Sequence, residues 1–465
     1  MPKKHLVVVL HGFMGWDRNV AMLAAKLQEH FGDTAVVLVP RCFGLLRTLT
    51  GIDVCAQRVL MEVKKQLDAH PALEHLSLVG FSMGGLICRY MAGILYAREF
   101  YGLKPLNFLT LASPHLGIRF DTDVAMTTRL IRAVARLIGG RSALQMLSGD
   151  EETHILALMA CRRSAFSMGL AAFERRVLYA STYGDRSVPF WSAFIAPWQA
   201  HEPSGPPMGV GGELRIDEVR YPHIEWEGTL SPPPSTPLTP PPNGRRRRTS
   251  RGSADGARCE EVATAPLAPI ATSVKRAANR HPPDTLTWTQ SVATAFLIAT
   301  ACCVLPLLWL TVLLPLGLLV RIMTASSPSA TPALDAELRV LEPPGDDGDG
   351  RSEANGDPAG ARPSVWRPAA LQAAVTSSGA SCAQEWMAVE LNSLTWVKVA
   401  VRFSIVRDGL TALVTHGHIV VRHKWLNRVG MDVLEHVVSQ MLTPPTSGSA
   451  STAKSARRRV AGRHG

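Results

Sequence analysis

The chain has 465 residues, of which 46% are hydrophobic and 19% are charged. This length allows two or three domains, or one large α/β domain with insertions, and the apolar content excludes a wholly disordered or collagen-like chain. The formal net charge is +11, but ten cations lie in two segments, 245–251 and 454–463, that we expect to be disordered. The charge therefore does not indicate a nucleic-acid-binding domain, and it fits either solvated tails or attraction to an anionic membrane surface.

The eight cysteines are scattered and form neither a CxxC pair nor a dense disulfide pattern. A zinc site and a secreted disulfide scaffold are therefore not expected, and no other motif implies a metal or a dissociable cofactor. The apolar run at 6–10 is too short for the core of a signal peptide. We expect a reduced protein that faces the cytosol.

Residues 5–196 alternate short apolar runs with helical patterns. The expected strands are 6–10, 36–39, 76–79, 108–112 and 177–180, and the expected helices between them include 19–31, 52–69 and 83–97. Strands that alternate with helices indicate a mostly parallel sheet with helices on both faces.

The composition changes several times along the chain, which predicts six segments. They are the first part of an α/β domain at 1–199, a disordered Pro/Arg-rich linker at 200–285, a hydrophobic segment at 286–323, a second disordered linker at 324–384, the rest of the α/β domain at 385–442 and a basic tail at 443–465. In the segment 385–442 we expect a strand within 396–403, a strand-like run after the sequence THGH, and a helix that reaches Met441.

The central part of the hydrophobic segment, 291–320, contains 30 residues without a charge. About 20 apolar residues suffice to cross a bilayer as a helix, so we expect a membrane anchor; a buried core helix is the alternative. Pro306 and Pro315 would each break or kink a helix in this segment.

Residues 80–84 read Gly-Phe-Ser-Met-Gly, a G-x-S-x-G motif between a strand pattern and a helix pattern. This strand–turn–helix context is typical of a nucleophile elbow and makes Ser82 the expected nucleophile, although a structural Gly-Ser turn is possible. Acyl transfer at a serine also needs an oxyanion hole. The backbone N–H of Met83 is one expected donor, and Phe13 in the sequence HGFMG supplies the second, with Met14 as the alternative.

A nucleophilic serine needs a base and a carboxylate that orients it. Asp185 follows the strand pattern at 177–180 and is the expected acid, with Asp150 as the alternative. In α/β-hydrolases the histidine follows the acid in the chain. The spacing does not separate His416 from His418 as the base, whereas His115 precedes both acids.

A basic amphipathic pattern covers 123–141, where apolar and arginine side chains fall on different helical faces. Such a helix can lie on a membrane surface or cover the serine as a lid. A helix that packs on its own sheet is the alternative.

Seven motifs together resemble the eukaryotic lipase-like family of putative serine esterases, which are α/β-hydrolases. They are HGFMG (11–15), TGID (50–53), GFSMGG (80–85), ASPHLG (112–117), YGDRSVPF (183–190), WVKVAVRF (396–403) and THGHIVVR (415–422). The resemblance covers about 5–196 and 385–441. It implies ester hydrolysis on lipid substrates by a triad of Ser82, Asp185 and His416, with His418 as the alternative base.

This triad straddles the hydrophobic segment. A single crossing by 291–320 would place His416 on the opposite side of the bilayer from Ser82, about 30 Å away. We therefore expect a hairpin, bent near Pro306, that enters and leaves the same leaflet. The sequence predicts a membrane-associated lipase or esterase of endomembranes or lipid droplets with its catalytic parts toward the cytosol. An acyltransferase with the same acyl-enzyme and a non-catalytic membrane-associated interaction protein are the alternatives.

Overall fold

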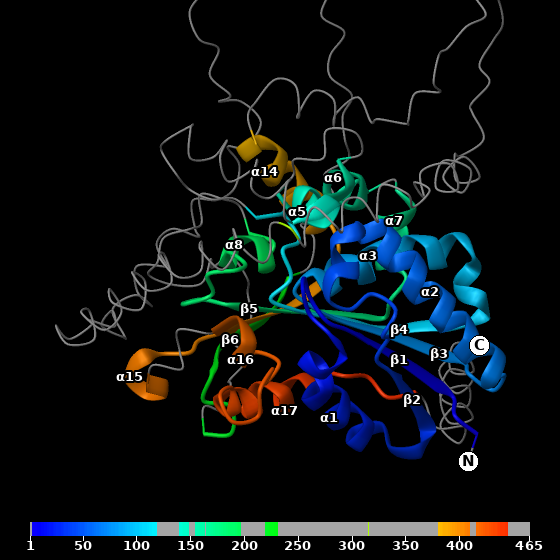
Figure 1. Ribbon diagram of the computed structural model, residues 1–465, viewed down its shortest axis with the longest axis horizontal. Helices are drawn as coiled ribbons and strands as arrows, with labels where there is room; N and C mark the ends of the chain where they lie inside the picture. The colour runs from blue at the N-terminus through cyan, green and yellow to red at the C-terminus, as the bar shows by residue number, and fades with distance from the viewer. Residues whose placement is uncertain are drawn as a thin grey trace, which may run out of the picture.

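The computed structural model describes residues 2–118, 139–147, 154–162, 164–196, 219–230, 380–409 and 415–444, together with Pro315. Within these residues, seven strands form one sheet in the order β2-β1-β3-β4-β5-β7-β6 (Figure 1). Their bounds are β1 His5–Leu10, β2 Ala35–Leu38, β3 His75–Phe81, β4 Lys104–Leu111, β5 Arg175–Ser181, β6 Ile224–Leu230 and β7 Trp396–Val401. All neighbours pair in parallel except β6, which is antiparallel to β7.

Helices lie on both faces of this sheet. The longer ones are α1 (Ala21–Phe31), α2 (Ile52–Ala69), α3 (Met83–Ala97), α14 (Ala380–Leu391) and α17 (Met431–Ser439). The shorter ones are α5 (Gly140–Met146), α6 (Ile155–Ala160), α7 (Ala165–Ala171), α8 (Phe190–Ala193), α15 (Ile405–Asp408) and α16 (Thr415–His418). Figure 1 shows α1 and α17 on one face, with α2, α3 and α7 on the other.

The strands are buried on both sides, as a covered parallel sheet requires. In β1, Leu6, Val8 and Leu10 contribute to one hydrophobic core, whereas Val7 and Val9 contribute to the other. This alternation follows from the two-residue repeat of a strand. The near-continuous apolar run of β1 therefore serves two cores, one on each face of the sheet.

The expected elements of residues 5–196 are confirmed to within a few residues, and they form a mostly parallel sheet of α/β-hydrolase type. β3 leads directly into α3 at Ser82. In the sheet, β1 lies between β2 and β3. The chain therefore reverses its direction across the sheet at β1, where functional residues gather at the carboxyl ends of the strands.

The prediction that the whole of 200–285 is a linker was wrong. Residues Ile224–Leu230 form β6, the edge strand that pairs with β7. The sequence IEWEGTL carries two glutamates and a glycine, so it lacks the apolar run that identified the other strands, and its backbone is held by a partner far along the chain. Likewise, α14 begins at Ala380, inside the second predicted linker.

The expected strand-like run after THGH was also wrong. Thr415–His418 is a short helix, and the following residues are turns. The apolar side chains Ile419, Val420 and Val421 are buried in the core beside α17, so they satisfy the hydrophobic pattern without joining the sheet.

The segment between β6 and α14 begins and ends within the same domain, because Leu230 of β6 pairs with Trp396 of β7. The hydrophobic stretch 291–320 belongs to this segment and, apart from Pro315, lies outside the described residues, as do the two basic stretches and most of the amphipathic pattern at 123–141. Where the structure does describe helices, none combines the length and the apolar character that crossing a membrane demands. The membrane anchor stays a prediction.

Candidate active site

Ser82 stands in the sharp turn between β3 and α3. Its backbone has φ 55° and ψ −128°, a conformation that costs a non-glycine residue of order 1–3 kcal/mol. The turn brings α3 back so closely that a Cβ on Gly80 would lie 2.5 Å from the Cα of Gly85, and one on Gly84 would lie 2.6 Å from the carbonyl oxygen of His11. These contacts explain why the motif needs glycine on both sides of the serine.

The structure brings Ser82, His416 and Asp185 together. The Nε2 atom of His416 lies 3.0 Å from the Oγ of Ser82, and its Nδ1 atom lies 2.7 Å from the Oδ2 of Asp185. The ring of His416 also packs against Phe81, with 4.8 Å between the ring centroids. The three side chains therefore form a continuous hydrogen-bonded chain.

The Asp185 carboxylate is fixed by its own turn. Its side chain is 3% exposed, and its Oδ1 accepts hydrogen bonds from the backbone N–H groups of Ser187 and Val188. Because a carboxylate can only accept, the proton between it and His416 belongs on Nδ1 of the imidazole. That tautomer leaves Nε2 free to accept the hydroxyl proton of Ser82.

The loop after β1 lies against Ser82. A Cβ on Gly12 would be 2.6 Å from the Cβ of Ser82 and 3.0 Å from its Oγ. The N–H of Met14 already donates to the Oγ1 of Thr48, whereas the N–H of Phe13 makes no hydrogen bond within the described part of the chain. Met83 is the first residue of α3, where a helix leaves its N–H groups without an internal partner. Phe13 thus has a more suitable amide than Met14 for an oxyanion hole with Met83.

His11 supports this loop from the core. Its ring stacks on Phe43 at a centroid distance of 4.2 Å, and its Nδ1 contacts the carbonyl oxygen of Gly12 at 3.0 Å. Burial lowers the pKa of His11, so the ring is neutral near pH 7 and acts as a packing element.

The other candidate residues lie elsewhere. The ring of His418 is fully buried, and its Nδ1 is hydrogen-bonded to the amide of Asn427 at 2.7 Å. His115 is also fully buried and contacts the hydroxyl of Thr110, and its pKa is well below the usual value because of burial. Asp150 lies outside the described residues.

A pocket of about 330 Å³ opens beside His416. It is formed by the turn after β5 and by the segment around α16, and its lining residues are Gly184, Arg186, Ser187, Thr415, His416, Gly417, Arg422, His423, Leu426 and Asn427. Sequence reasoning missed Arg186 and Arg422, although one follows Asp185 directly and the other comes six residues after His416.

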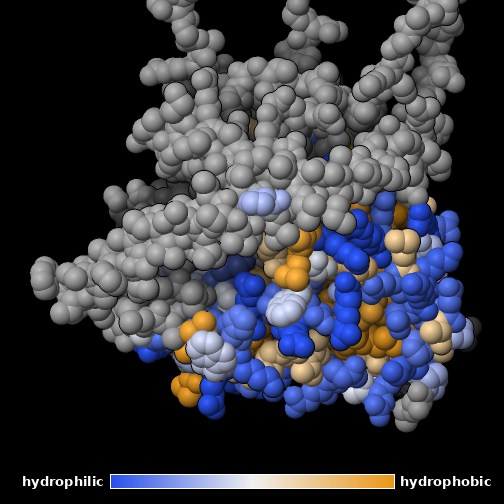
Figure 2. Space-filling model, viewed as in Figure 1, coloured by the Kyte–Doolittle hydropathy of each residue, from blue (hydrophilic) through white to orange (hydrophobic). Residues whose placement is uncertain are grey.

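Large apolar side chains are exposed on the loops around the site. They are Met14, Trp16, Leu45, Tyr183 and Trp425. Most of them follow the carboxyl ends of strands, and Trp425, which is 83% exposed, lies within the segment that lines the pocket. The described surface on the face shown in Figure 2 is mostly hydrophilic, with apolar side chains scattered over it.

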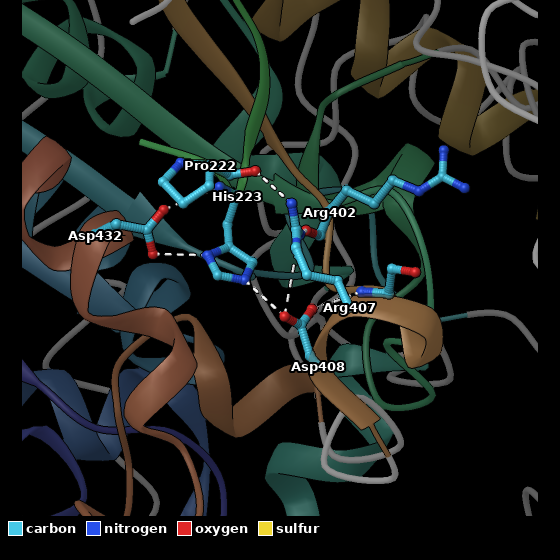
Figure 3. A network of polar contacts seen from close by, with 7 residues as sticks. Pro222, His223, Arg402, Arg407, Asp408 and Asp432 are labelled. Atoms are coloured by element: carbon cyan, nitrogen blue, oxygen red, sulfur yellow. Dashed lines mark hydrogen bonds and ion pairs between the residues drawn. The ribbon is translucent and has the colours of Figure 1, made fainter. Parts of the chain in front are cut away.

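A second polar network joins β6, α15 and α17 (Figure 3). The Nδ1 of His223 lies 2.8 Å from Asp432, and its Nε2 lies 3.1 Å from Asp408. Asp408 also contacts Arg407 and accepts the N–H of Ser404. This network anchors the start of β6 to the segment that leads toward His416.

Known proteins match part of the chain. The family model described as "Putative serine esterase (DUF676)" matches residues 1–197. The "Putative lipase C4A8.10" of Schizosaccharomyces pombe is 30% identical over 198 residues, which is 40% of this chain and 25% of that protein. The "Putative lipase ROG1" of Saccharomyces cerevisiae is 29% identical over 211 residues, which is 42% of this chain and 29% of that protein. The chain thus spans less than a third of these relatives.

Solved structures with a similar arrangement include Aspergillus fumigatus lipase B, at 12% identity and a TM-score of 0.29 over 42% of this chain and 43% of that chain. A lipase-esterase related protein from Clostridium acetobutylicum matches at 14% identity and a TM-score of 0.23 over 41% and 79%. At these scores the structures add nothing to the fold assignment, which rests on the sheet order and the turn at Ser82. The family match supports the resemblance of the motifs: residues 1–197 are similar to the family described as putative serine esterases.

Proposed function

We propose that the protein is a serine hydrolase that cleaves carboxylic esters of lipids through an acyl-enzyme on Ser82. The observation that carries this proposal is the hydrogen-bonded chain from Ser82 through His416 to Asp185. A serine at a strained turn, a histidine within reach of its hydroxyl and a buried carboxylate behind the histidine are the parts that acyl transfer needs. The family match to serine esterases supports the same reaction.

In the first half of the reaction, the Oγ of Ser82 attacks the ester carbonyl carbon while Nε2 of His416 takes the hydroxyl proton. The negative charge that develops on the carbonyl oxygen is held by the N–H groups of Phe13 and Met83. His416 then gives its proton to the leaving alcohol, and the carbon–oxygen bond of the ester breaks. Asp185 keeps the imidazole oriented and stabilises its charged form.

In the second half, His416 removes a proton from water, which attacks the acyl-enzyme. The acid leaves, and Ser82 regains its proton. An acyltransferase would differ only in using another alcohol in place of water. The assay for the proposed function therefore includes an acceptor alcohol, and acyl transfer that exceeds hydrolysis would identify the acyltransferase.

Lipid esters fit the site better than soluble esters because apolar side chains surround it. Trp16, Leu45 and Trp425 are exposed to water in the structure, although burying a large apolar side chain is worth about 1.5–3 kcal/mol. A lipid surface against these loops would recover part of that free energy. The relatives described as lipases support the same substrate class.

We also propose that the protein is anchored to a membrane through 291–320, with the catalytic domain on the cytosolic side. The segment that contains this stretch begins after β6 and ends before α14, and these two elements belong to one domain. A stretch that enters the bilayer must therefore return to the same side, as a hairpin bent near Pro306 does. Protease cleavage sites inserted at 285 and at 325 should both be cut by a protease on the same side of sealed vesicles. Cleavage of the two sites from opposite sides would exclude the hairpin.

The decisive experiment for the activity is labelling of the purified full chain with a fluorophosphonate, followed by hydrolysis assays on glycerolipid and phospholipid esters. Labelling and hydrolysis should both disappear in Ser82→Ala, and labelling should slow strongly in His416→Ala. Labelling that persists in Ser82→Ala would show that another residue is the nucleophile. A wild-type protein that neither reacts nor hydrolyses esters would favour the non-catalytic interaction protein.

A further inference from the structure

We propose that the pocket beside His416 is a subsite for a phosphate group carried by the leaving alcohol of the substrate, and that Arg422 determines this specificity. The inference rests on the proposed ester hydrolysis and adds to it the chemical class of the leaving group. It distinguishes phosphate-bearing lipids, in which the alcohol carries a phosphate, from neutral acylglycerols.

The lining of the pocket is cationic. It includes the two arginines Arg186 and Arg422, and among the described residues that line it there is no aspartate or glutamate. Ser187 and Asn427 add neutral polar groups at the same walls. A concave site with several hydrogen-bond donors and cations but no carboxylate selects an anion.

The charge of Arg422 has no anionic partner in the described part of the chain. Its Nε atom is buried without a hydrogen bond, and no ion pair forms between its guanidinium and a described carboxylate. Burial lowers the pKa of Arg422, which shows that the site holds this cation at a cost. A bound phosphate would supply both the missing charge and the missing acceptor, and arginine can bind a phosphate through two parallel hydrogen bonds.

Arg422 also lies close to the catalytic groups. Its backbone N–H donates to the carbonyl oxygen of Gly417, the residue that follows His416. The pKa of His11, which precedes the oxyanion loop, is lowered chiefly by burial and to a smaller extent by the positive charge of Arg422. Arg422 and His416 line the same pocket.

His416 lines the pocket and Ser82 does not, so the pocket is assigned to the part of the substrate that His416 must reach. His416 must protonate the oxygen of the leaving alcohol, so that alcohol has to lie beside the imidazole rather than beside the acyl chain. In a glycerophospholipid this alcohol carries the phosphate. A volume of about 330 Å³ lies at the lower end of the range for small-molecule sites, which suits a phosphorylated glycerol unit.

A test uses short-chain substrates as monomers, below the concentration at which they form micelles, so that adsorption to a lipid surface plays no part. Dihexanoylglycerol 3-phosphate and dihexanoylglycerol share their acyl chains and differ in the phosphate. The wild-type full chain should prefer the phosphate ester in kcat/KM. In Arg422→Gln this preference should fall by about 10-fold to 100-fold, the factor expected for a hydrogen bond to a charged group.

Arg428→Gln is the matched control, because Arg428 is an exposed arginine of the same segment that does not line the pocket. It should keep the preference of the wild type. Fluorophosphonate labelling of Ser82 in each variant establishes that its catalytic site is folded. Inhibition of the wild type provides a measurement without any substitution: glycerol 3-phosphate should inhibit hydrolysis at lower concentration than inorganic phosphate does.

The outcomes separate this inference from the proposed function. If the wild type hydrolyses neither ester, the proposed function fails. If it hydrolyses both and Arg422→Gln leaves the preference unchanged, hydrolysis stands and the phosphate subsite is wrong. A preference that appears only on vesicles would assign the effect to adsorption on an anionic surface, and equal inhibition by inorganic phosphate would assign the pocket to the free ion; either result overturns the subsite.

Discussion

The Nε2 atom of His416 lies 3.0 Å from the Oγ of Ser82, although 334 positions separate the two residues in the chain. The sheet accounts for this approach. Ser82 follows β3 and Asp185 follows β5, while His416 comes after β7, the neighbour of β5 in the sheet. All three residues therefore lie at the carboxyl ends of parallel strands, where α/β proteins place their sites.

The two histidines of the sequence THGH have different expected roles, which substitution should separate. His416→Ala should reduce kcat for ester hydrolysis by about 10²-fold to 10⁴-fold, because it removes the general base. His418→Gln should lower the melting temperature, because its buried ring is bonded to Asn427, yet Ser82 should still react with a fluorophosphonate. Rates of labelling and thermal unfolding of both variants check this; the reverse pattern would make His418 the base.

Gly12 is expected to be essential because it touches the nucleophile. The Cβ of alanine at this position would lie 2.6 Å from the Cβ of Ser82, so the loop that carries Phe13 must shift. Loss of one oxyanion donor costs about 10²-fold to 10³-fold in kcat, and Gly12→Ala should lose at least that much.

Gly44→Ala is the matched control in the neighbouring loop. Its φ of −66° suits any residue, and the nearest atom to the added Cβ would be 3.8 Å away. Its kcat should stay within about twofold of the wild type. Equal losses in the two variants would mean that the close contact at Gly12 has no special part in the reaction.

Sequence patterns predicted the parallel part of the fold well, because buried parallel strands are short apolar runs and the helices between them carry strong periodicity. Ser82 was singled out as the expected nucleophile by a motif whose glycines are needed by the turn itself. Asp185 and His416 were narrowed down by chain order and by the resemblance, and the structure brings these two residues to Ser82.

Interactions between distant segments could not be predicted in this way. Edge strand β6 has a mixed sequence and takes its register from β7, more than 160 positions later. The pocket beside His416 combines a turn after β5 with the segment after α16. From the local sequence alone, an arginine such as Arg422 is expected to be exposed to solvent. The choice between Phe13 and Met14 depended on the hydroxyl of Thr48, which the local sequence does not indicate.

Trp425 should matter at a lipid surface and much less in free solution. Its side chain is 83% exposed beside the pocket, so insertion into an interface would bury it. Trp425→Ser should reduce the ratio of activity on phospholipid vesicles to activity on a soluble short-chain ester by about 10-fold. Met61→Ser is the control, since Met61 is 60% exposed on α2, and the ratio should not change. An unchanged ratio in Trp425→Ser would remove this residue from the interface.

His223 should contribute strongly to stability because it separates two carboxylates. Both of its ring nitrogens face acidic side chains, Asp408 and Asp432, whose side chains are 3% and 11% exposed. His223→Ala leaves both without this partner and should lower the free energy of unfolding by about 3–5 kcal/mol. His30→Ala, at an exposed position on α1, should change it by less than about 0.5 kcal/mol. Urea titrations at neutral pH compare the two variants.

The same network should make the domain sensitive to acid. Burial alone would raise the pKa of Asp408, but the hydrogen bonds from His223 and from the backbone N–H of Ser404 outweigh it, and the pKa is lowered. A carboxyl group with a lowered pKa in the folded state stabilises the fold above its unfolded pKa, near 4, and loses that contribution as the pH falls through the folded value. Asp408→Asn should therefore show a weaker loss of stability below about pH 4 than the wild type.

Lys398 should make the stability of the domain rise with pH in the neutral to alkaline range. Its amino group is fully buried in β7, where it donates to the carbonyl oxygen of Ile195 and to the side chain of Asn392. Burial lowers the pKa of Lys398 to about 7, whereas an unfolded chain keeps it near 10.5. Between these values the unfolded state binds more protons than the folded state, so stability rises with pH by up to about 1.4 kcal/mol per pH unit.

Lys398→Met removes this titration while it keeps a long apolar side chain in the core. Urea titrations at pH 7, 8 and 9 measure the free energy of unfolding of the wild type and of Lys398→Met. The stability of the wild type relative to Lys398→Met should increase from each pH to the next. Other titrating groups cancel in this difference because both proteins contain them. A difference that stays constant with pH would mean that Lys398 remains charged in the folded protein, and that its two hydrogen bonds compensate for the burial of the charge.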